Sequence, residues 1–228
     1  EVVHLMQARP SDPALAGEFR EAIKRCRDFG EPGTSASALA GLRFCLAPEH
    51  RDALIECVLV ILRRLVPDDA AGLRVLVGAV SGDSLPPLLR EALALCPPDV
   101  VDALILKKRS ASIHMSLEDI AVVGRLMKAR GLDLGRGTLR SALQRAQDAN
   151  GADAVKVYEA ISKMSKDAQV HLIHLQYLVR AGRLVEFEEQ ASALVRCLGS
   201  QILSGLFASK LFYEMDSSVL LSVLALEL

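Results

Sequence analysis

Residues 170–195 read VHLIHLQYLVRAGRLVEFEEQASALV, and this stretch decides the fold class. Apolar residues recur in both halves, and Ala181-Gly182 separates them. A glycine between two helices lets the chain reverse, so that the apolar stripes of the two helices face each other. The pattern therefore predicts a helical hairpin, with helices over residues 167–180 and 183–198. One hairpin leaves its outer apolar face uncovered, so we expect neighbouring hairpins to stack on it.

A similar pattern lies upstream, where residues 138–164 predict two helices joined at Asn150-Gly151. The two turn glycines, Gly151 and Gly182, are 31 positions apart. That separation is close to the length of the helix–turn–helix repeats that build stacked arrays. The last third of the chain therefore predicts sequential helical hairpins.

Residues 151–158 and 181–186 resemble the turn and second helix of pentatricopeptide- and tetratricopeptide-type repeats. The resemblance extends over about residues 116–198. It implies an α-solenoid, in which short helices pack antiparallel, neighbour on neighbour. A pentatricopeptide-like array further implies binding of single-stranded RNA, with about one base read by each repeat.

The remainder of the chain is also helical in pattern, without a regular period. Pro13 and Gly30 bracket an amphipathic stretch, which predicts a helix over residues 14–29 ended by Gly30 in a left-handed conformation. Residues 49–66 are apolar on most faces and should lie centrally in a core. Alternation of apolar and polar residues is almost absent. The sequence predicts an all-α fold, an array of about 13 short antiparallel helices arranged as an α-solenoid of the helical-repeat type. An irregular helical domain is the alternative.

The length of 228 residues suits one large domain or two small ones. In the first interpretation, residues 1–228 form a single solenoid-like helical domain. In the second, residues 1–106 form an irregular helical half and residues 107–228 a repeat-like half.

The composition of 51% hydrophobic and 24% charged residues, with a net charge of −1, excludes intrinsic disorder and collagen-like repeats. The five cysteines have no C-x-x-C spacing and lie among aliphatic neighbours, which predicts buried, reduced thiols. We therefore expect an intracellular reducing compartment: cytosol, nucleus or organelle matrix. No stretch is apolar and long enough to predict a membrane span.

Motifs for chemistry are scarce. His171 and His174 have a spacing that could place both on one side of a helix, but no third metal ligand is recognisable nearby. Nucleophile elbows, P-loops and kinase signatures are missing from the sequence. We expect a chain that is not an enzyme, with no catalytic, cofactor-binding or metal-binding residues, no cofactor and no small-molecule substrate.

Charge is concentrated in the middle of the chain, where residues 107–145 hold nine Lys and Arg against three Asp and Glu. Such a block attracts a phosphate backbone or an acidic protein surface. Cations that cap helix C-termini and face solvent are the alternative interpretation. The candidate patch for an anionic partner or RNA consists of Lys107, Lys108, Arg109, Arg125, Lys128, Arg130, Arg136, Arg140 and Arg145.

Two functions remain in view. Balanced charge and a high aliphatic content, including the apolar run 219–226, favour a non-catalytic helical-repeat scaffold that binds other protein subunits within a larger multi-subunit assembly. The pentatricopeptide resemblance implies the alternative, single-stranded RNA binding in organellar RNA processing or translation. A helical domain that completes a longer polypeptide is the third possibility.

Overall fold

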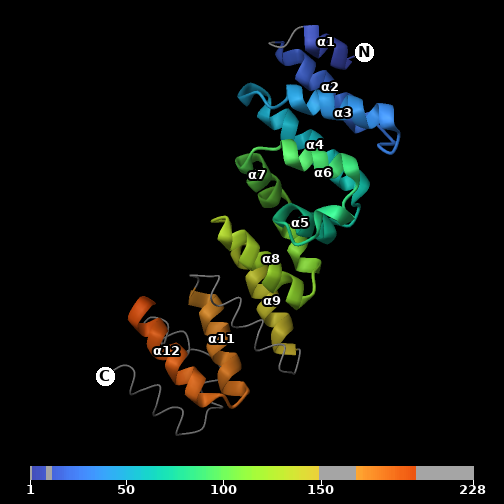
Figure 1. Ribbon diagram of the computed structural model, residues 1–228. Helices are drawn as coiled ribbons and strands as arrows, with labels where there is room; N and C mark the ends of the chain where they lie inside the picture. Colours follow the sequence, from blue (N-terminus) through green and yellow to red (C-terminus); the bar gives the residue numbers. More distant parts are fainter. Residues whose placement is uncertain (1, 9–11, 149–167, 199–228) are drawn as a thin grey trace. The chain divides into compact units, whose positions relative to one another are not determined.

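The computed structural model describes residues 2–8, 12–148 and 168–198. Over these ranges the chain forms eleven α-helices, three short 3-10 helices and no strand (Figure 1). The prediction of an all-α fold is therefore confirmed. Three predicted helices, over residues 151–164, 201–213 and 217–228, lie outside the described residues, as does the apolar run 219–226.

The chain divides into two compact units. The first takes in residues up to His114 together with the short segment Ala129–Leu132. Its helices are α1 (Val2–Ala8), α2 (Pro13–Arg25), α3 (Pro32–Phe44), η1 (Pro48–His50), α4 (Arg51–Leu65), α5 (Asp69–Val77), η2 (Gly82–Ser84), α6 (Pro87–Leu95), α7 (Pro98–Lys108) and η3 (Arg109–His114). The second unit takes in residues Met115–Lys128 and those from Asp133 onward. Its helices are α8 (Leu117–Ala129, whose last residue lies in the first unit), α9 (Arg136–Asp148), α11 (Ala168–Arg180) and α12 (Leu184–Leu198).

Helix α4 forms the centre of the first unit, as its all-round apolar sequence predicts. It packs against α2, α6 and α7. Seven of its fifteen residues are buried: Leu54, Ile55, Cys57, Val58, Leu59, Ile61 and Leu62. Because apolar side chains occupy several faces of α4, neighbouring helices can cover it from more than one side.

Proline and aspartate begin several helices of the first unit. Pro13, Pro87 and Pro98 each stand first in their helices, where the missing N–H costs no hydrogen bond. The side chain of Asp12 accepts a hydrogen bond from the Ala14 N–H, and that of Asp68 accepts one from the Ala71 N–H. These local signals fix where α2 and α5 begin.

Helix α2 ends earlier than predicted, at Arg25 rather than just before Gly30. Cys26 is extended, with φ −62° and ψ 125°, and Gly30 does not have a positive φ. The Asp28 carboxylate accepts a hydrogen bond from the Gly30 N–H at 2.6 Å, a turn that competes with helix for the backbone donor. The prediction that Gly30 ends the helix in a left-handed conformation is therefore wrong.

The hairpin of α11 and α12 forms as the sequence predicts. Gly182 has a φ of +69°, a conformation that favours glycine. The Gly182 N–H donates to the Val179 carbonyl, and the Arg183 N–H donates to the Leu178 carbonyl, at 3.0 and 2.9 Å. These two bonds form a Schellman motif, which closes α11 and reverses the chain into α12. The upstream turn at Asn150-Gly151 lies outside the described residues.

Across the described residues, no helix has the length and the apolar character that crossing a bilayer requires.

Candidate functional site

The cations of the basic segment, residues 107–145, differ in burial even between neighbours. At the end of α7, Lys107 is exposed whereas Lys108 is only 4% exposed. Arg109, the first residue of η3, is exposed again. Of these three consecutive cations, the middle one is therefore buried and the other two are exposed.

Lys108 is held by a carboxylate from a distant part of the sequence. Its Nζ pairs with Oδ1 of Asp69, the first residue of α5, and α5 packs against α7. The Asp69 side chain is 64% exposed, so the pair joins a buried ammonium to a carboxylate in contact with water. The hydrogen bond from Lys108 lowers the pKa of Asp69, and the charges of Lys108, Arg63 and His114 lower it further. Lys108 therefore has a structural partner and lies beneath the surface.

Two exposed cations and two exposed aliphatic side chains lie within eight consecutive residues, at the end of α7 and in η3. We call this set, Leu106, Lys107, Arg109 and Ile113, the α7–η3 surface. Leu106 is 40% exposed and Ile113 is 43% exposed. Both side chains are therefore in contact with water, unlike the buried Leu104 and Ile105 of α7.

The carboxylates of α7 are engaged elsewhere. Asp99 pairs with Arg51, and Asp102 pairs with Arg130 at 3.3 Å. Among the residues that the structure describes, Lys107 and Arg109 have no carboxylate within ion-pair distance. The α7–η3 surface consequently carries a net positive charge beside its two aliphatic side chains.

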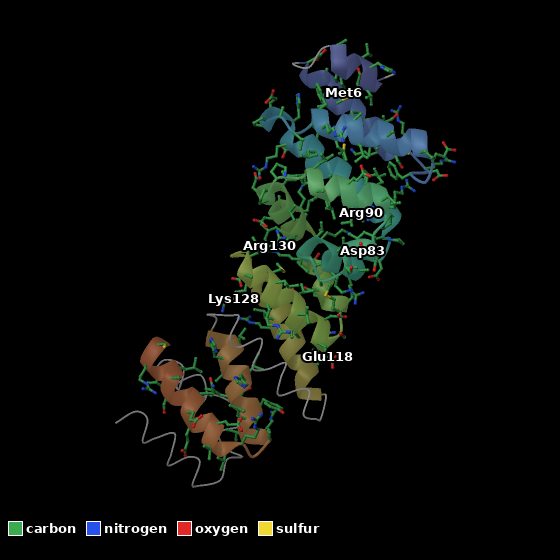
Figure 2. All side chains as sticks on the ribbon, in the orientation of Figure 1. Met6, Asp83, Arg90, Glu118, Lys128 and Arg130 are labelled. Atoms are coloured by element: carbon green, nitrogen blue, oxygen red, sulfur yellow. The ribbon has the colours of Figure 1, made fainter. Side chains whose placement is uncertain are left out.

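The remaining cations of the predicted patch are distributed over both units. In the second unit, Arg125 and Lys128 are exposed on α8, and Arg140 is exposed on α9. Lys128 and Glu118 lie at opposite ends of α8 (Figure 2). Arg130, also labelled in Figure 2, belongs to the first unit, where it pairs with Asp102. The side chain of Arg136 lies outside the described part of the structure.

Arg145 is half-buried and structural. Its Nη1 donates a hydrogen bond to the Met115 carbonyl at 3.0 Å, which joins the last turn of α9 to the residue that precedes the Ser116 cap of α8. The Nε and Nη2 atoms of Arg145 are buried without a hydrogen-bond partner within the described ranges. This contact brings the last turn of α9 to the start of α8.

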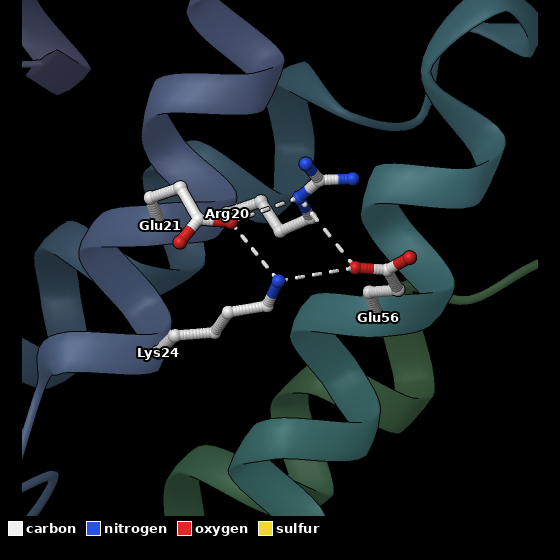
Figure 3. Close-up of polar contacts among 4 residues, drawn as sticks. All are labelled: Arg20, Glu21, Lys24 and Glu56. Atoms are coloured by element: carbon white, nitrogen blue, oxygen red, sulfur yellow. Dashed lines mark hydrogen bonds and ion pairs between the residues drawn. The ribbon is translucent and has the colours of Figure 1, made fainter.

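An ion cluster that the sequence did not predict joins α2 to α4 (Figure 3). Arg20 and Lys24 each lie near Oε2 of Glu56, at 3.5 and 3.6 Å, and both also lie near Glu21. The Lys24 hydrogen bond lowers the pKa of Glu21, and the same bond raises the pKa of Lys24. The spacing of Glu21 and Lys24 is visible in the sequence, whereas the partner on α4 depends on tertiary packing. The side chains of this cluster are half-exposed, and the ion pairs of Arg20 and Lys24 with Glu56 join α2 to α4.

An apolar pocket of about 520 Å³ lies between α1, α2 and α3. The stripe of α2 that includes Phe19, Ile23 and Cys26 forms one wall, and small residues of α3 such as Ala38 form another. Beside it, α3 approaches α2 closely, since a Cβ at Gly41 would collide with the ring of Phe19. The pocket arises because α3 presents small side chains to a helix with large ones.

The histidine pair lies on α11. His174 is 2% exposed and His171 is half-buried. Burial, together with the smaller effects of His171 and Arg183, lowers the pKa of His174 from 6.5 to about 4. No group of three or more His, Cys, Asp or Glu side chains in the described ranges could hold a metal ion.

The prediction of buried thiols is confirmed for two of the five cysteines. Cys45 and Cys57 are buried, Cys26 and Cys96 are half-buried, and all five thiols are free. Burial raises the pKa of Cys45 and Cys96 to about 11 and that of Cys57 to about 12, so these thiols stay protonated at neutral pH. Cys197, near the end of α12, is exposed, so the prediction of burial is wrong for this residue.

No protein-family model, no curated protein and no solved structure matches this sequence.

Proposed function

We propose that this chain is a non-catalytic helical-repeat scaffold that binds other protein subunits within a larger assembly. In this proposal the short helices stack as an α-solenoid of about 13 helices over residues 1–228, in a reducing compartment such as the cytosol, the nucleus or an organelle matrix. The α11–α12 hairpin, closed at Gly182, supports the stacked arrangement. The free thiols of Cys45 and Cys57 support the reducing compartment.

The α7–η3 surface is the observation that carries this proposal. Leu106 and Ile113 leave apolar area in contact with water, next to Lys107 and Arg109. Removing the remaining exposed area of such an aliphatic side chain from water contributes about 1 kcal/mol. A partner that covers both side chains gains this contribution twice, and clustered apolar residues with a polar rim are typical of protein interfaces.

The test replaces the two aliphatic side chains of the surface in the full chain. The double variant Leu106→Ser/Ile113→Ser should lose subunits that copurify with the parent chain, as measured by quantitative mass spectrometry. The matched control, Val122→Ser/Val185→Ser, removes two exposed aliphatic side chains of the second unit. It should keep those subunits. Copurification that is the same for the parent and both variants, with unchanged circular dichroism, would show that the surface does not bind protein.

Single-stranded RNA binding is the second candidate, and the exposed cations Arg125, Lys128 and Arg140 favour it. Phosphate contacts make such binding strongly dependent on salt. A gel shift with single-stranded RNA at two salt concentrations tests this candidate. Reversal of the three charges with Arg125→Glu, Lys128→Glu and Arg140→Glu should abolish the shift, while Arg145 is kept because it joins α9 to Met115. Binding that ignores both salt and charge reversal would exclude this candidate.

A further inference from the structure

We infer that the α7–η3 surface binds an acidic amphipathic segment of a partner protein. The inference rests on the proposed scaffold function and specifies the chemistry of the partner. It follows from the charges and aliphatic side chains that the fold leaves exposed at this surface.

The charge of the surface follows from how the fold pairs its carboxylates. Asp69 is engaged by the buried Lys108, and Asp102 is engaged by Arg130. Among the described residues, no acidic side chain lies within ion-pair distance of the exposed Lys107 and Arg109. Complementary charge on a partner suppresses wrong partners and accelerates association. The segment that fits this surface carries Asp or Glu.

The apolar part of the partner follows from Leu106 and Ile113. These residues are seven positions apart, and a helical rise of 1.5–2 Å per residue separates them by at most about 14 Å. Apolar side chains at positions i and i+7 of a partner helix are separated by about 10 Å, within that limit. An amphipathic helix with two apolar anchors two turns apart, flanked by carboxylates, therefore suits both features.

The aliphatic character of the surface favours a peptide over RNA. Proteins that bind single-stranded RNA stack bases on aromatic rings or on guanidinium planes. The large hydrophobic side chains exposed in the described ranges are all aliphatic, and those of the α7–η3 surface are Leu106 and Ile113. Lys107 and Arg109 alone would attract a phosphate backbone. Binding of RNA, however, would not explain why the aliphatic residues on either side of them in the sequence, Leu106 and Ile113, are exposed.

The test is a selection of random peptides of about 16 residues, long enough for four helical turns, on the full chain. The enriched peptides should have a net negative charge and apolar residues one or two turns apart. The variant Lys107→Glu/Arg109→Glu should bind the best acidic peptide about tenfold more weakly by fluorescence anisotropy, and selection on it should enrich basic peptides. The control Arg125→Glu/Lys128→Glu should change that affinity by less than about twofold.

The outcomes separate this inference from the proposed function. Enriched peptides without an acidic bias, or an affinity that Lys107→Glu/Arg109→Glu leaves unchanged, would overturn the inference. The scaffold would still stand if subunits were lost with Leu106→Ser/Ile113→Ser. If no peptide were enriched and no subunit depended on the surface, both would fail. Binding of an oligouridine of about 20 nucleotides that is lost only with Lys107→Glu/Arg109→Glu, with no peptide enriched, would make this a nucleic-acid surface and the inference wrong.

Discussion

Lys108 in the first unit and His174 in the second are both basic side chains that the fold buries, and they differ in charge. Lys108 is within hydrogen-bonding distance of Asp69, whose carboxylate remains in water. His174 lies near the positive charges of His171 and Arg183, and Glu186 opposes them only weakly. The ammonium of Lys108 is paired, whereas the imidazole of His174 is neutral at physiological pH.

The comparison shows that burial alone does not decide the charge of a basic side chain. Moving a charge out of water is costly unless an opposite charge or hydrogen bonds compensate. At Lys108 the compensating group comes from the start of α5, and at His174 the proton is lost instead. Protonation of His174 should therefore reduce stability, and so should loss of the Asp69 carboxylate that pairs with Lys108, by a different mechanism.

The largest expected effect is on the pH dependence conferred by His174. Above pH 6.5 its imidazole is neutral in both the folded and the unfolded chain. As the pH falls from 6.5 to about 4, the unfolded chain takes up a proton that the folded chain does not, so the free energy of unfolding decreases. The full loss is about 3 kcal/mol, reached near pH 4. Urea unfolding of the parent and of His174→Gln at several pH values measures it.

The difference in stability between the parent and His174→Gln should change steeply over this pH range, because the variant lacks the titrating group. The control His171→Gln replaces the half-buried neighbour on the same helix. Its difference from the parent should change less with pH. A difference between parent and His174→Gln that stays constant from pH 7 to pH 4 would show that His174 is not held neutral by burial.

The next largest effect concerns Asp69 and Lys108, whose substitutions should differ in cost. Asp69→Asn leaves a buried ammonium without its counter-charge and should destabilise the chain by about 2 kcal/mol, less than for a fully buried pair because Asp69 is exposed. Lys108→Met leaves only a solvated carboxylate, so its cost should be below about 1 kcal/mol. Urea denaturation at pH 7 compares the two variants.

Adding Lys108→Met to Asp69→Asn should recover most of the lost stability, because the unpaired ammonium is removed. Asp83→Asn serves as the control, since Asp83 is an exposed carboxylate of the same unit (Figure 2). It should change the free energy of unfolding by less than about 0.5 kcal/mol. A larger cost for Lys108→Met than for Asp69→Asn would mean that packing of the lysine stem, and not its charge, governs this site.

Local features of the fold could be predicted from the sequence, and features that depend on helix packing could not. The Gly182 turn and the apolar α4 follow from nearby residues alone, because a left-handed glycine and an all-round apolar helix have few alternatives. The early end of α2 was missed because the Asp28 side chain competes for the Gly30 N–H. That signal is visible in the sequence but weaker than the apolar pattern.

The candidate site shows the same limit. The excess of cations after residue 106 is visible in the composition. The sequence does not indicate, however, which of the adjacent Lys107 and Lys108 is buried. Only the packing of α7 against α5, whose first residue is 39 positions upstream of Lys108, makes one of them buried and the other exposed. The pairing of Asp102 with Arg130 is equally non-local. The net charge of the α7–η3 surface thus depends on tertiary contacts.

The smallest expected effect concerns Arg145, a basic side chain that is less buried than Lys108 and His174. It is half-buried and donates one hydrogen bond, to the Met115 carbonyl, while its Nε and Nη2 atoms make none within the described ranges. Arg145→Met removes that bond at a cost of about 1 kcal/mol and also removes two buried donors without partners, which offsets part of the cost. The net loss by urea unfolding should therefore be below about 1 kcal/mol, and Arg140→Met on the exposed face of α9 should cost less than about 0.5 kcal/mol. A loss above about 2 kcal/mol for Arg145→Met would place Arg145 with Lys108, as a buried cation on which the packing of its unit depends.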